Sequence, residues 1–434
     1  MTALLILLGC LVLSSWPLIK IFSFFWFNYL LYLVLSSFIS TLFLGIGPQI
    51  KLVRMQNAIN YAGLKNTQGV KPKVIKIVYI DDYRTKLFVK SIGVGPDKYE
   101  GKKNDLESTF KQKVEKVSFS KDREHVEIDL CKRELPTMIP FSHISSTPLK
   151  ESSFVLGESL AGGILNQDIS TLPHLLIGGT TGGGKSVFFK STLINLLKTT
   201  PHLQMFLIDL KKGVEVREFG DLPNVRIAKN ETEAIEVLQA VKDEMDKRYT
   251  YIEASSDKKV IIPKKDNKDL IVIGIDEASV LYGKTSTNKK KKELMQKARE
   301  LTDELAKLAR AAGIHLIIAT QKPIKDSIDT KTLENLPGRI SFKMSTHAGS
   351  NSMLGNGKAY SLPDVKGRAI WKGGNQFIEI QTPYISEEEI LAEIESIKEG
   401  HESEKFKNLQ PILELGKKEV RGQKDLNEET QKPT

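Results

Sequence analysis

One glycine-rich segment restricts the fold of this chain more than any other. Residues 179–186 read Gly-Thr-Thr-Gly-Gly-Gly-Lys-Ser and fit the pattern G-x-x-x-x-G-K-[ST] at every fixed position. The apolar run His174–Ile177 precedes the segment, and the apolar stretch Val187–Leu197 follows it. A strand, a glycine-rich turn and a helix in this order place backbone N–H groups around an anion at a helix N-terminus. The segment therefore predicts a phosphate-binding loop in an α/β domain.

The residue types in this loop have separate expected tasks. The predicted phosphate cradle consists of Gly179, Thr180, Thr181, Gly182, Gly183, Gly184, Lys185 and Ser186. Lys185 is expected to reach the β- and γ-phosphates of a nucleoside triphosphate, and the Ser186 hydroxyl is expected to ligate Mg²⁺. A glycine-rich turn that arose by chance is the alternative, and the flanking strand and helix argue against it.

A second, acidic element follows the apolar run Ile271–Ile275, which ends in Asp276 and Glu277. Because α/β sheets bind ligands beyond the carboxyl ends of their strands, we expect Asp276 to hold Mg²⁺ through water. Glu277 is then expected to orient or deprotonate the attacking water. Gln321, after the run Leu316–Ala319, is a candidate γ-phosphate sensor. A solvated strand end is the alternative for the two acids, and simple strand capping is the alternative for Gln321. Together these residues favour nucleotide hydrolysis over static binding.

Apolar patterns predict the fold class of the second half of the chain. Near-continuous apolar runs indicate strands buried on both faces of a parallel sheet: Leu175–Ile177, Met205–Ile208, Leu270–Ile275 and His315–Ala319. Helical spacing relates two further sets: Ile235, Leu238, Val241, Met245 and Tyr249, then Leu294, Ala298, Leu301, Leu305 and Leu308. Alternating strands and helices predict a doubly wound α/β domain with right-handed crossovers.

The first fifty residues form a predicted membrane anchor. Their single charged side chain, Lys20, separates the apolar runs Ala3–Ile19 and Phe22–Ile46. A spanning helix needs about 20 apolar residues, so the pattern predicts a transmembrane helical hairpin. One long helix with an interfacial segment, or a signal peptide, is the alternative. Lys51 and Arg54 follow the second run, and the positive-inside bias then predicts a multi-pass cell-membrane protein whose large C-terminal part is cytoplasmic.

The remaining chain divides into three expected parts. Residues 51–150 predict a small mixed α+β domain with four short strands and no catalytic spacing: Val74–Ile80, Leu87–Val94, Val114–Phe119 and Val126–Leu130. This domain is expected to end in a linker, because prolines and a serine-rich stretch occupy residues 136–148. Residues 151–385 predict the α/β domain. Residues 386–434 predict a charged helix, Ser386–Ile397, followed by a tail.

Charge and cysteine content narrow the expected partners. The chain has 63 Lys and Arg against 53 Asp and Glu, a formal net charge of +10 that lies after the apolar N-terminus. This surplus is typical of proteins with an anionic partner such as nucleic acid, nucleotide or lipid headgroups. Lys289–Lys292, and Lys211 with Lys212, are candidate phosphate contacts, with a solvated charged surface as the alternative. Two cysteines exclude a disulfide framework.

Residues 154–384 resemble the FtsK/SpoIIIE-type DNA-translocase motor. Beyond the two nucleotide elements, the resemblance rests on six segments in the order in which that family has them: Pro173–Leu176, Ile208–Lys211, Glu244–Tyr249, Ala309–His315, Ala319–Pro323 and Pro337–Phe342. The resemblance implies a RecA-like P-loop NTPase fold and a homohexameric ring around duplex DNA, bound largely without regard to sequence. It also implies ATP and Mg²⁺ at the subunit interfaces.

The same family resemblance singles out two arginines as candidate functional residues. Arg339 matches the arginine that this family presents to the nucleotide of the neighbouring subunit, which would make it catalytic. Arg310 aligns with the other arginine of the motifs, and its role is open. A structural role is the alternative for either side chain.

Outside the motor, the sequence departs from the chromosome-partitioning members of the family. Those proteins have more membrane spans, a long Pro/Gln-rich linker and a winged-helix domain, whereas the tail after Ile385 is too charged for a winged-helix core. The architecture is more similar to the FtsK-like coupling proteins of Gram-positive conjugative elements. That similarity implies transfer of DNA, with its relaxase, to a secretion channel. A chromosome or plasmid segregation pump, a membrane ATPase scaffold that recruits channel components, and a pump for protein substrates stay open, as do strand preference and polarity.

Overall fold

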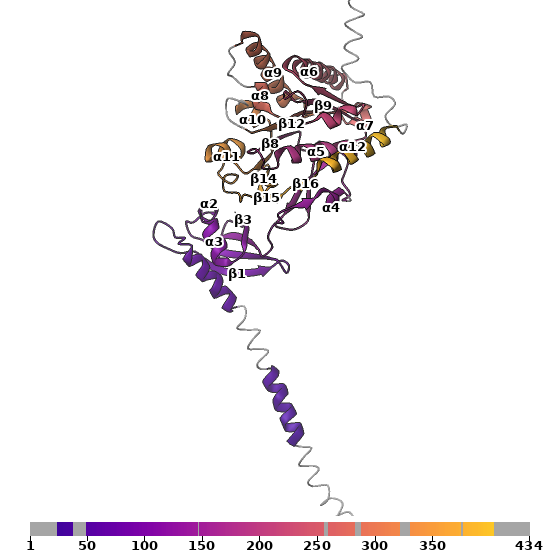
Figure 1. The fold of residues 1–434 in the computed structure, drawn as a ribbon. Helices are drawn as coiled ribbons and strands as arrows, with labels where there is room; N and C mark the ends of the chain where they lie inside the picture. The colour runs from indigo at the N-terminus through magenta and orange to yellow at the C-terminus, as the bar shows by residue number, and fades with distance from the viewer. Residues whose placement is uncertain are drawn as a thin grey trace, which may run out of the picture. The chain divides into compact units, whose positions relative to one another are not determined.

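The computed structural model describes residues 24–37, 49–145, 147–255, 259–282, 288–321, 330–374 and 376–402 of the 434-residue chain. The chain divides between Arg133 and Glu134 into two compact units, each described separately here (Figure 1). This division lies before the expected boundary at residue 150, because the segment that follows Arg133 packs within the second unit.

Most of the predicted membrane anchor lies outside the described residues. The run Ala3–Ile19 is wholly outside, and residues 24–37 of the second run form a helix. Large apolar side chains along this helix are exposed, among them Phe25 and Tyr32. Within the described part of the chain, no helix has both the length and the apolar character needed to cross a bilayer. The hairpin therefore stays a prediction.

The first unit contains a four-stranded antiparallel sheet in the order β1-β2-β4-β3. Its elements are β1 (Lys73–Tyr79), β2 (Arg84–Lys90), α2 (Pro96–Glu100), α3 (Lys103–Phe110), β3 (Lys113–Phe119) and β4 (His125–Cys131), after a helix at residues 49–61. The four predicted strands are present. Alternate residues of β2 and β4, including Leu87 and Ile128, are fully buried against the helices, as a sheet with one covered face requires.

The second unit is built on a ten-stranded sheet in the order β10-β9-β11-β12-β8-β13-β14-β15-β6-β7. The strands are β6 (Ser153–Ser159), β7 (Ile164–Asp168), β8 (His174–Gly178), β9 (Leu203–Ile208), β10 (Val225–Ala228), β11 (Leu270–Ile275), β12 (Ile314–Thr320), β13 (Gly338–Phe342), β14 (Arg368–Gly373) and β15 (Gln376–Gln381). The strands from β10 to β13 in this order are parallel, and β8, β9, β11 and β12 are buried along their whole length, as predicted.

The other four strands correct the expectation of a wholly parallel sheet. β14 pairs antiparallel with β13, and β15, β6 and β7 continue in antiparallel pairs. β14 and β15 are joined by a short connection, which allows an antiparallel hairpin but leaves no room for a crossover helix. The half-buried pattern of β15 also lacks the continuous apolar run that marks a central parallel strand.

Helices cover both faces of this sheet. The longer helices are α5 (Lys185–Thr199), α6 (Glu231–Glu253), α9 (Lys289–Leu308) and α12 (Glu387–Glu402). Alternate residues of β11 face opposite cores: Ile273 packs with α6 and α9, and Val272 packs with α5 and α12. α6 and α9 bury most of the predicted apolar positions, but Tyr249 and Leu294 are half-buried, and Leu308 is 47% exposed because it is the last residue of α9.

The predicted linker and C-terminal helix are both parts of this second unit. In the linker region, β5 (Ile139–Pro140) pairs with β16 (Pro383–Tyr384), and Phe141 and Ile144 of α4 (Phe141–Ser145) are buried in its core. α12 begins with a capping box, in which the Ser386 hydroxyl accepts from the Glu389 N–H and the Glu389 carboxylate accepts from the Ser386 N–H. The predicted tail, residues 403–434, lies outside the described residues.

Candidate nucleotide site

The glycine-rich loop leaves β8 and enters α5 at the carboxyl edge of the sheet, where the sequence predicted it. Gly184 has φ +114°, and a Cβ there would lie 3.1 Å from the Gly367 backbone, so only glycine fits. A Cβ on Gly179 would lie 2.7 Å from the Phe342 Cβ. The loop is therefore held closely against β13 and the segment before β14, in the conformation that a phosphate cradle needs.

Three charged groups meet at the base of this loop. The Lys185 Nζ lies 3.9 Å from the Asp276 Oδ1, 3.8 Å from the Glu277 Oε2 and 3.4 Å from the Asp276 carbonyl oxygen. The three side chains are at most 8% exposed. Buried charges persist when they are paired, and a buried ammonium beside two carboxylates is poised to exchange partners with an anionic ligand. The structure thus brings together the predicted lysine and the predicted acidic pair.

Glu277 is held in place by β12, the strand that lies between β8 and β11. Its Oε1 accepts from the Thr320 hydroxyl at 3.2 Å, from the Gln321 N–H at 3.2 Å and from the Ser279 hydroxyl at 2.6 Å. Thr320 and Ser279 were not among the predicted site residues. Thr320 could have been predicted from the sequence, because its hydroxyl lies at the end of a buried strand and directly precedes Gln321, which is a predicted site residue.

Gln321 lies within reach of the phosphate loop, as predicted. Its side-chain oxygen accepts from the Thr181 hydroxyl at 3.0 Å. Thr180 takes a different contact, since its N–H and its hydroxyl both donate to the Lys343 carbonyl, at 3.2 and 3.1 Å. Ser186 is half-buried at the start of α5. The residues Lys322 and Pro323 of the same motif lie outside the described residues.

Asp276 also contacts Lys211, on the loop after β9. The Lys211 Nζ lies 3.2 Å from the Asp276 Oδ2, and the Asp209 carboxylate holds this loop by accepting the N–H groups of Lys211 and Glu215, each at 2.9 Å. Partial burial lowers the pKa of Lys211, but the charge and hydrogen bond of Asp276, together with the charges of Glu215 and Glu277, outweigh burial and raise the pKa. A residue predicted as a DNA contact is therefore engaged with the acidic pair.

A divalent cation fits this set of donors. Within the described residues, the Asp276 Oδ1 is buried and accepts no hydrogen bond, although a carboxylate oxygen in that position requires a partner. Mg²⁺ prefers carboxylate, hydroxyl and water oxygens. Ser186 supplies a hydroxyl in the first turn of α5, directly after Lys185, whose Nζ lies 3.9 Å from the Asp276 Oδ1. The residues present therefore suit a nucleotide with its magnesium ion.

The two arginines from the family motifs lie away from this centre. Arg339, on β13, donates to the carbonyls of Leu336 and Met353, each at 3.0 Å, and to that of Leu333. Burial lowers the pKa of Arg339. Arg310 is exposed and precedes β12, at the opposite end of the strand from Gln321. In this chain, the Arg339 guanidinium is bound to backbone carbonyls.

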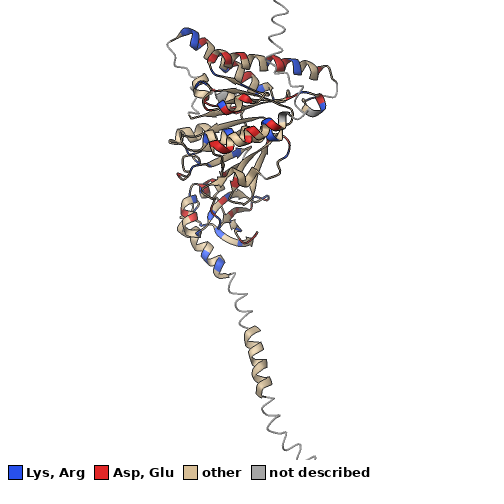
Figure 2. Ribbon diagram, turned by 45° about the vertical axis from the view of Figure 1, so that its right-hand side comes forward, with Lys and Arg blue, Asp and Glu red and all other residues tan. Residues whose placement is uncertain are grey.

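The lysine run Lys289–Lys292 forms the exposed first turn of α9 (Figure 2). The Lys291 Nζ forms an ion pair with Glu231 at 2.7 Å. The loop at residues 283–287, which precedes this turn, lies outside the described residues. The run is a solvent-facing cationic surface, and its contact with DNA stays a prediction.

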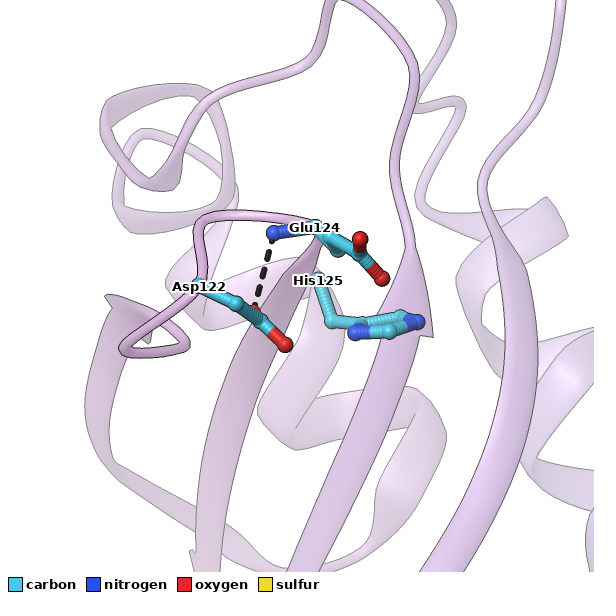
Figure 3. A group of neighbouring side chains, drawn as sticks. All are labelled: Asp122, Glu124 and His125. Carbon is cyan, nitrogen blue, oxygen red and sulfur yellow. Dashed lines mark hydrogen bonds between the residues drawn. The ribbon is translucent and has the colours of Figure 1, made fainter.

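A separate acidic group lies in the first unit, in the turn between β3 and β4 (Figure 3). Ligand atoms of Asp122, Glu124 and His125 lie within 4.8 Å of one another. The Asp122 Oδ1 accepts from the Glu124 N–H at 3.1 Å and from the Ser120 hydroxyl, so hydrogen bonds of the turn explain its position. Exposed carboxylates in such a turn are not by themselves a metal site.

Comparisons with known proteins show which family part of this chain resembles. Residues 147–269, which include the phosphate loop, match the FtsK/SpoIIIE family. Over this part, the chain is similar to proteins of the FtsK/SpoIIIE family. It is 35% identical over 267 residues to the DNA translocase FtsK of Caldanaerobacter subterraneus subsp. tengcongensis, over 58% of this chain and 36% of that protein. It is 29% identical over 293 residues to the DNA translocase FtsK of Staphylococcus aureus, over 63% of this chain and 36% of that protein. The chain thus spans about a third of the length of these relatives.

Solved structures agree on the fold. The pCW3 conjugation coupling protein TcpA, with ATPγS, has a TM-score of 0.58 at 24% identity and covers 80% of this chain and 99% of its own. EssC (ATPases 2 and 3) from Geobacillus thermodenitrificans has a TM-score of 0.52 at 17% identity, over 64% of this chain and 54% of its own. These similarities confirm the predicted α/β P-loop NTPase fold.

Proposed function

We propose that this chain is a membrane-anchored, ATP-driven DNA translocase that acts as a coupling protein in conjugative transfer. The observation that carries the proposal is the convergence of Lys185, Asp276 and Glu277 beneath a glycine-rich loop in an FtsK-like domain. A static nucleotide-binding protein needs no buried carboxylate beside the phosphate loop. A hydrolase does, because an activated water must attack the γ-phosphate.

The chain's own residues divide the work of hydrolysis. The loop amides and Lys185 bind the phosphates, and the lysine exchanges its contacts with Asp276 and Glu277 for the nucleotide. Glu277, oriented by Thr320 and the Gln321 N–H, accepts a proton from the attacking water at its carboxylate. The Gln321 side chain, beside Thr181, orients that water or the γ-phosphate. Ser186 and Asp276 would hold a magnesium ion, which when bound would neutralise part of the phosphate charge.

DNA is the proposed substrate of the motor. The curated relatives are named DNA translocases, and the net charge of +10 favours phosphate contacts. Binding through phosphates carries no base code, so affinity should fall steeply with salt and vary little with sequence. A homohexameric ring, with ATP sites between subunits, completes this proposal.

The conjugative role is proposed from architecture. The apolar N-terminal runs favour a membrane anchor with a cytoplasmic motor. The fold match to TcpA, a conjugation coupling protein, covers more of the chain than the second unit alone contains. A relaxase and secretion-channel proteins are the proposed partners. A segregation pump is the second candidate, favoured by the names of the curated relatives.

Hydrolysis and its response to DNA test this proposal. The full chain in lipid nanodiscs is assayed for ATP hydrolysis with and without duplex DNA, beside Glu277→Gln and the exposed control Glu253→Gln. We expect DNA to stimulate turnover, the Glu277 variant to lose it and the control to keep it. Turnover that ignores DNA would instead favour the membrane scaffold or a pump for protein substrates.

A further inference from the structure

The ten-stranded sheet has an open edge at β10. Among the described strands, β10 pairs only with β9. The Asn224 and Ala228 carbonyls accept from the N–H groups of Met205 and Asp209, so the even-numbered residues of β10 face β9. In a parallel pair, the residue between two such positions points its N–H and C=O the other way. Ile227 therefore presents its backbone donor and acceptor to the open side.

A pocket of about 580 Å³ lies along this edge, between β10 and the 3-10 helix η1 (Arg217–Asp221). Three basic side chains line it, Arg217, Arg226 and Lys229, and its single acidic lining residue is Asp221. Arg217 and Lys229 are exposed and Arg226 is half-buried. The lining thus has a surplus of positive charge that no nucleotide contact accounts for, because β9, β11 and β12 separate β10 from the phosphate-loop strand.

A buried acceptor points to a missing partner in the same pocket. The Asn224 side chain is 7% exposed, and its Nδ2 donates to the Leu203 carbonyl at 2.9 Å. Its Oδ1 is buried without a hydrogen-bond partner in the part of the chain that the structure describes. A buried acceptor without a partner is destabilising, and a donor from a ligand would satisfy it.

We propose that this edge binds an extended acidic segment of a partner protein, which adds a strand beside β10. A peptide backbone is the ligand whose N–H and C=O groups match those of a strand edge, and carboxylates on its side chains match the basic residues that line the pocket. Duplex DNA offers phosphates for the cations but nothing for the Ile227 backbone groups. This docking surface is separate from the nucleotide site and does not depend on the proposed translocase function.

A defined peptide probe tests the docking surface. A fluorescein-labelled peptide that alternates glutamate and threonine is titrated against the full chain in nanodiscs, with fluorescence anisotropy as the readout. Its matched controls are a lysine–threonine peptide and the acidic peptide N-methylated at alternate residues. Arg226→Glu and Ile227→Pro test the protein side, because proline at 227 removes the outward N–H and keeps the ladder to β9. Lys265→Glu, an exposed charge reversal elsewhere on the second unit, is the control variant.

We expect saturable binding of the acidic peptide that falls by about tenfold or more in Arg226→Glu and Ile227→Pro and is unchanged in Lys265→Glu. The lysine peptide and the N-methylated peptide should not bind. Equal binding of the N-methylated peptide would overturn strand addition, whatever the folding of the proline variant. Absent saturable binding, or an equal loss in Lys265→Glu, would refute the site. A loss of duplex-DNA affinity in Arg226→Glu without a loss of peptide binding would assign the edge to nucleic acid instead.

Discussion

At the scale of single residues, Glu277 carries the catalytic hypothesis. Replacing it by glutamine keeps an oxygen for the Thr320 and Gln321 contacts but removes the proton acceptor. We expect Glu277→Gln to lower turnover by about 10²–10⁴-fold and to leave nucleotide affinity nearly unchanged. Turnover assays and titration with a fluorescent ATP analogue measure the two quantities. A variant that hydrolyses ATP at the native rate would remove Glu277 from the mechanism.

Lys211 makes a second prediction at this scale, because its ammonium lies 3.2 Å from the Oδ2 of the carboxylate whose unpartnered Oδ1 would face a bound cation. Removing the lysine should make Asp276 more available to Mg²⁺. In Lys211→Ala, the Mg²⁺ concentration for half-maximal ATPγS binding should fall by about twofold to fivefold, as expected for a partly exposed ion pair. Lys212→Ala, which alters the neighbouring exposed lysine, is the control. An unchanged Mg²⁺ dependence in Lys211→Ala would contradict this competition.

Substitution of Arg339 distinguishes a structural role of this side chain from a catalytic one. Its guanidinium serves three backbone carbonyls, so Arg339→Ala should lower the free energy of unfolding by about 1–3 kcal/mol, measured by urea denaturation. The exposed control Arg310→Ala should change it by less than about 0.5 kcal/mol. If Arg339→Ala instead unfolds like the native protein and loses turnover, the intersubunit role implied by the family resemblance gains support over the backbone contact.

At the scale of elements, continuous apolar runs and helical apolar spacing in the sequence were sufficient to predict the buried strands and helices. β8, β9, β11, β12, α6 and α9 all lie where apolar periodicity placed them, since burial on both faces or on one stripe leaves a direct trace in sequence. β14 and β15 were missed because β14 includes the polar residues Arg368 and Lys372, β15 is half-buried, and the two strands pair as a hairpin. The segment at 136–148 was read as a linker because proline was taken as a breaker, although Phe141 and Ile144 anchor it.

A buried histidine pair gives an element-scale prediction about pH. His174 on β8 and His315 on β12 have ring centroids 6.5 Å apart, and the Leu316 N–H donates to the His174 Nδ1 at 3.0 Å. Burial lowers the pKa of His174 to about 3 and that of His315 to about 4. The unfolded chain takes up protons below pH about 6.5, and the folded one does not. Stability should therefore fall as pH drops from about 6.5 towards 4, by on the order of 1 kcal/mol per pH unit for each histidine.

Urea unfolding across that pH range measures the effect. His174→Asn keeps an acceptor for the Leu316 N–H but cannot titrate, so its stability should depend less steeply on pH. His143→Asn, at an exposed position, should match the native slope. Identical slopes in all three proteins would show that the pair does not set the acid sensitivity.

At the scale of the whole molecule, the sequence locates the site residues within one chain but carries less information about the assembly. The loop, the acidic pair and Gln321 converge in one chain, and each could be located from a motif and the strand that precedes it. The proposed catalytic role of Arg339 and the formation of a ring depend on other copies of the chain. DNA binding depends on a polyanion that is a separate molecule. A single chain folds by burying its own apolar surface, so its pattern carries little information about contacts between copies.

ATP-driven movement along DNA tests the central claim most directly. The full chain in nanodiscs is given a duplex that carries a labelled third strand, and release of that strand is followed with ATP and with ATPγS. We predict release that requires ATP hydrolysis, is lost in Glu277→Gln and is insensitive to the duplex sequence. ATP hydrolysis that proceeds without DNA and never releases the strand would contradict the account.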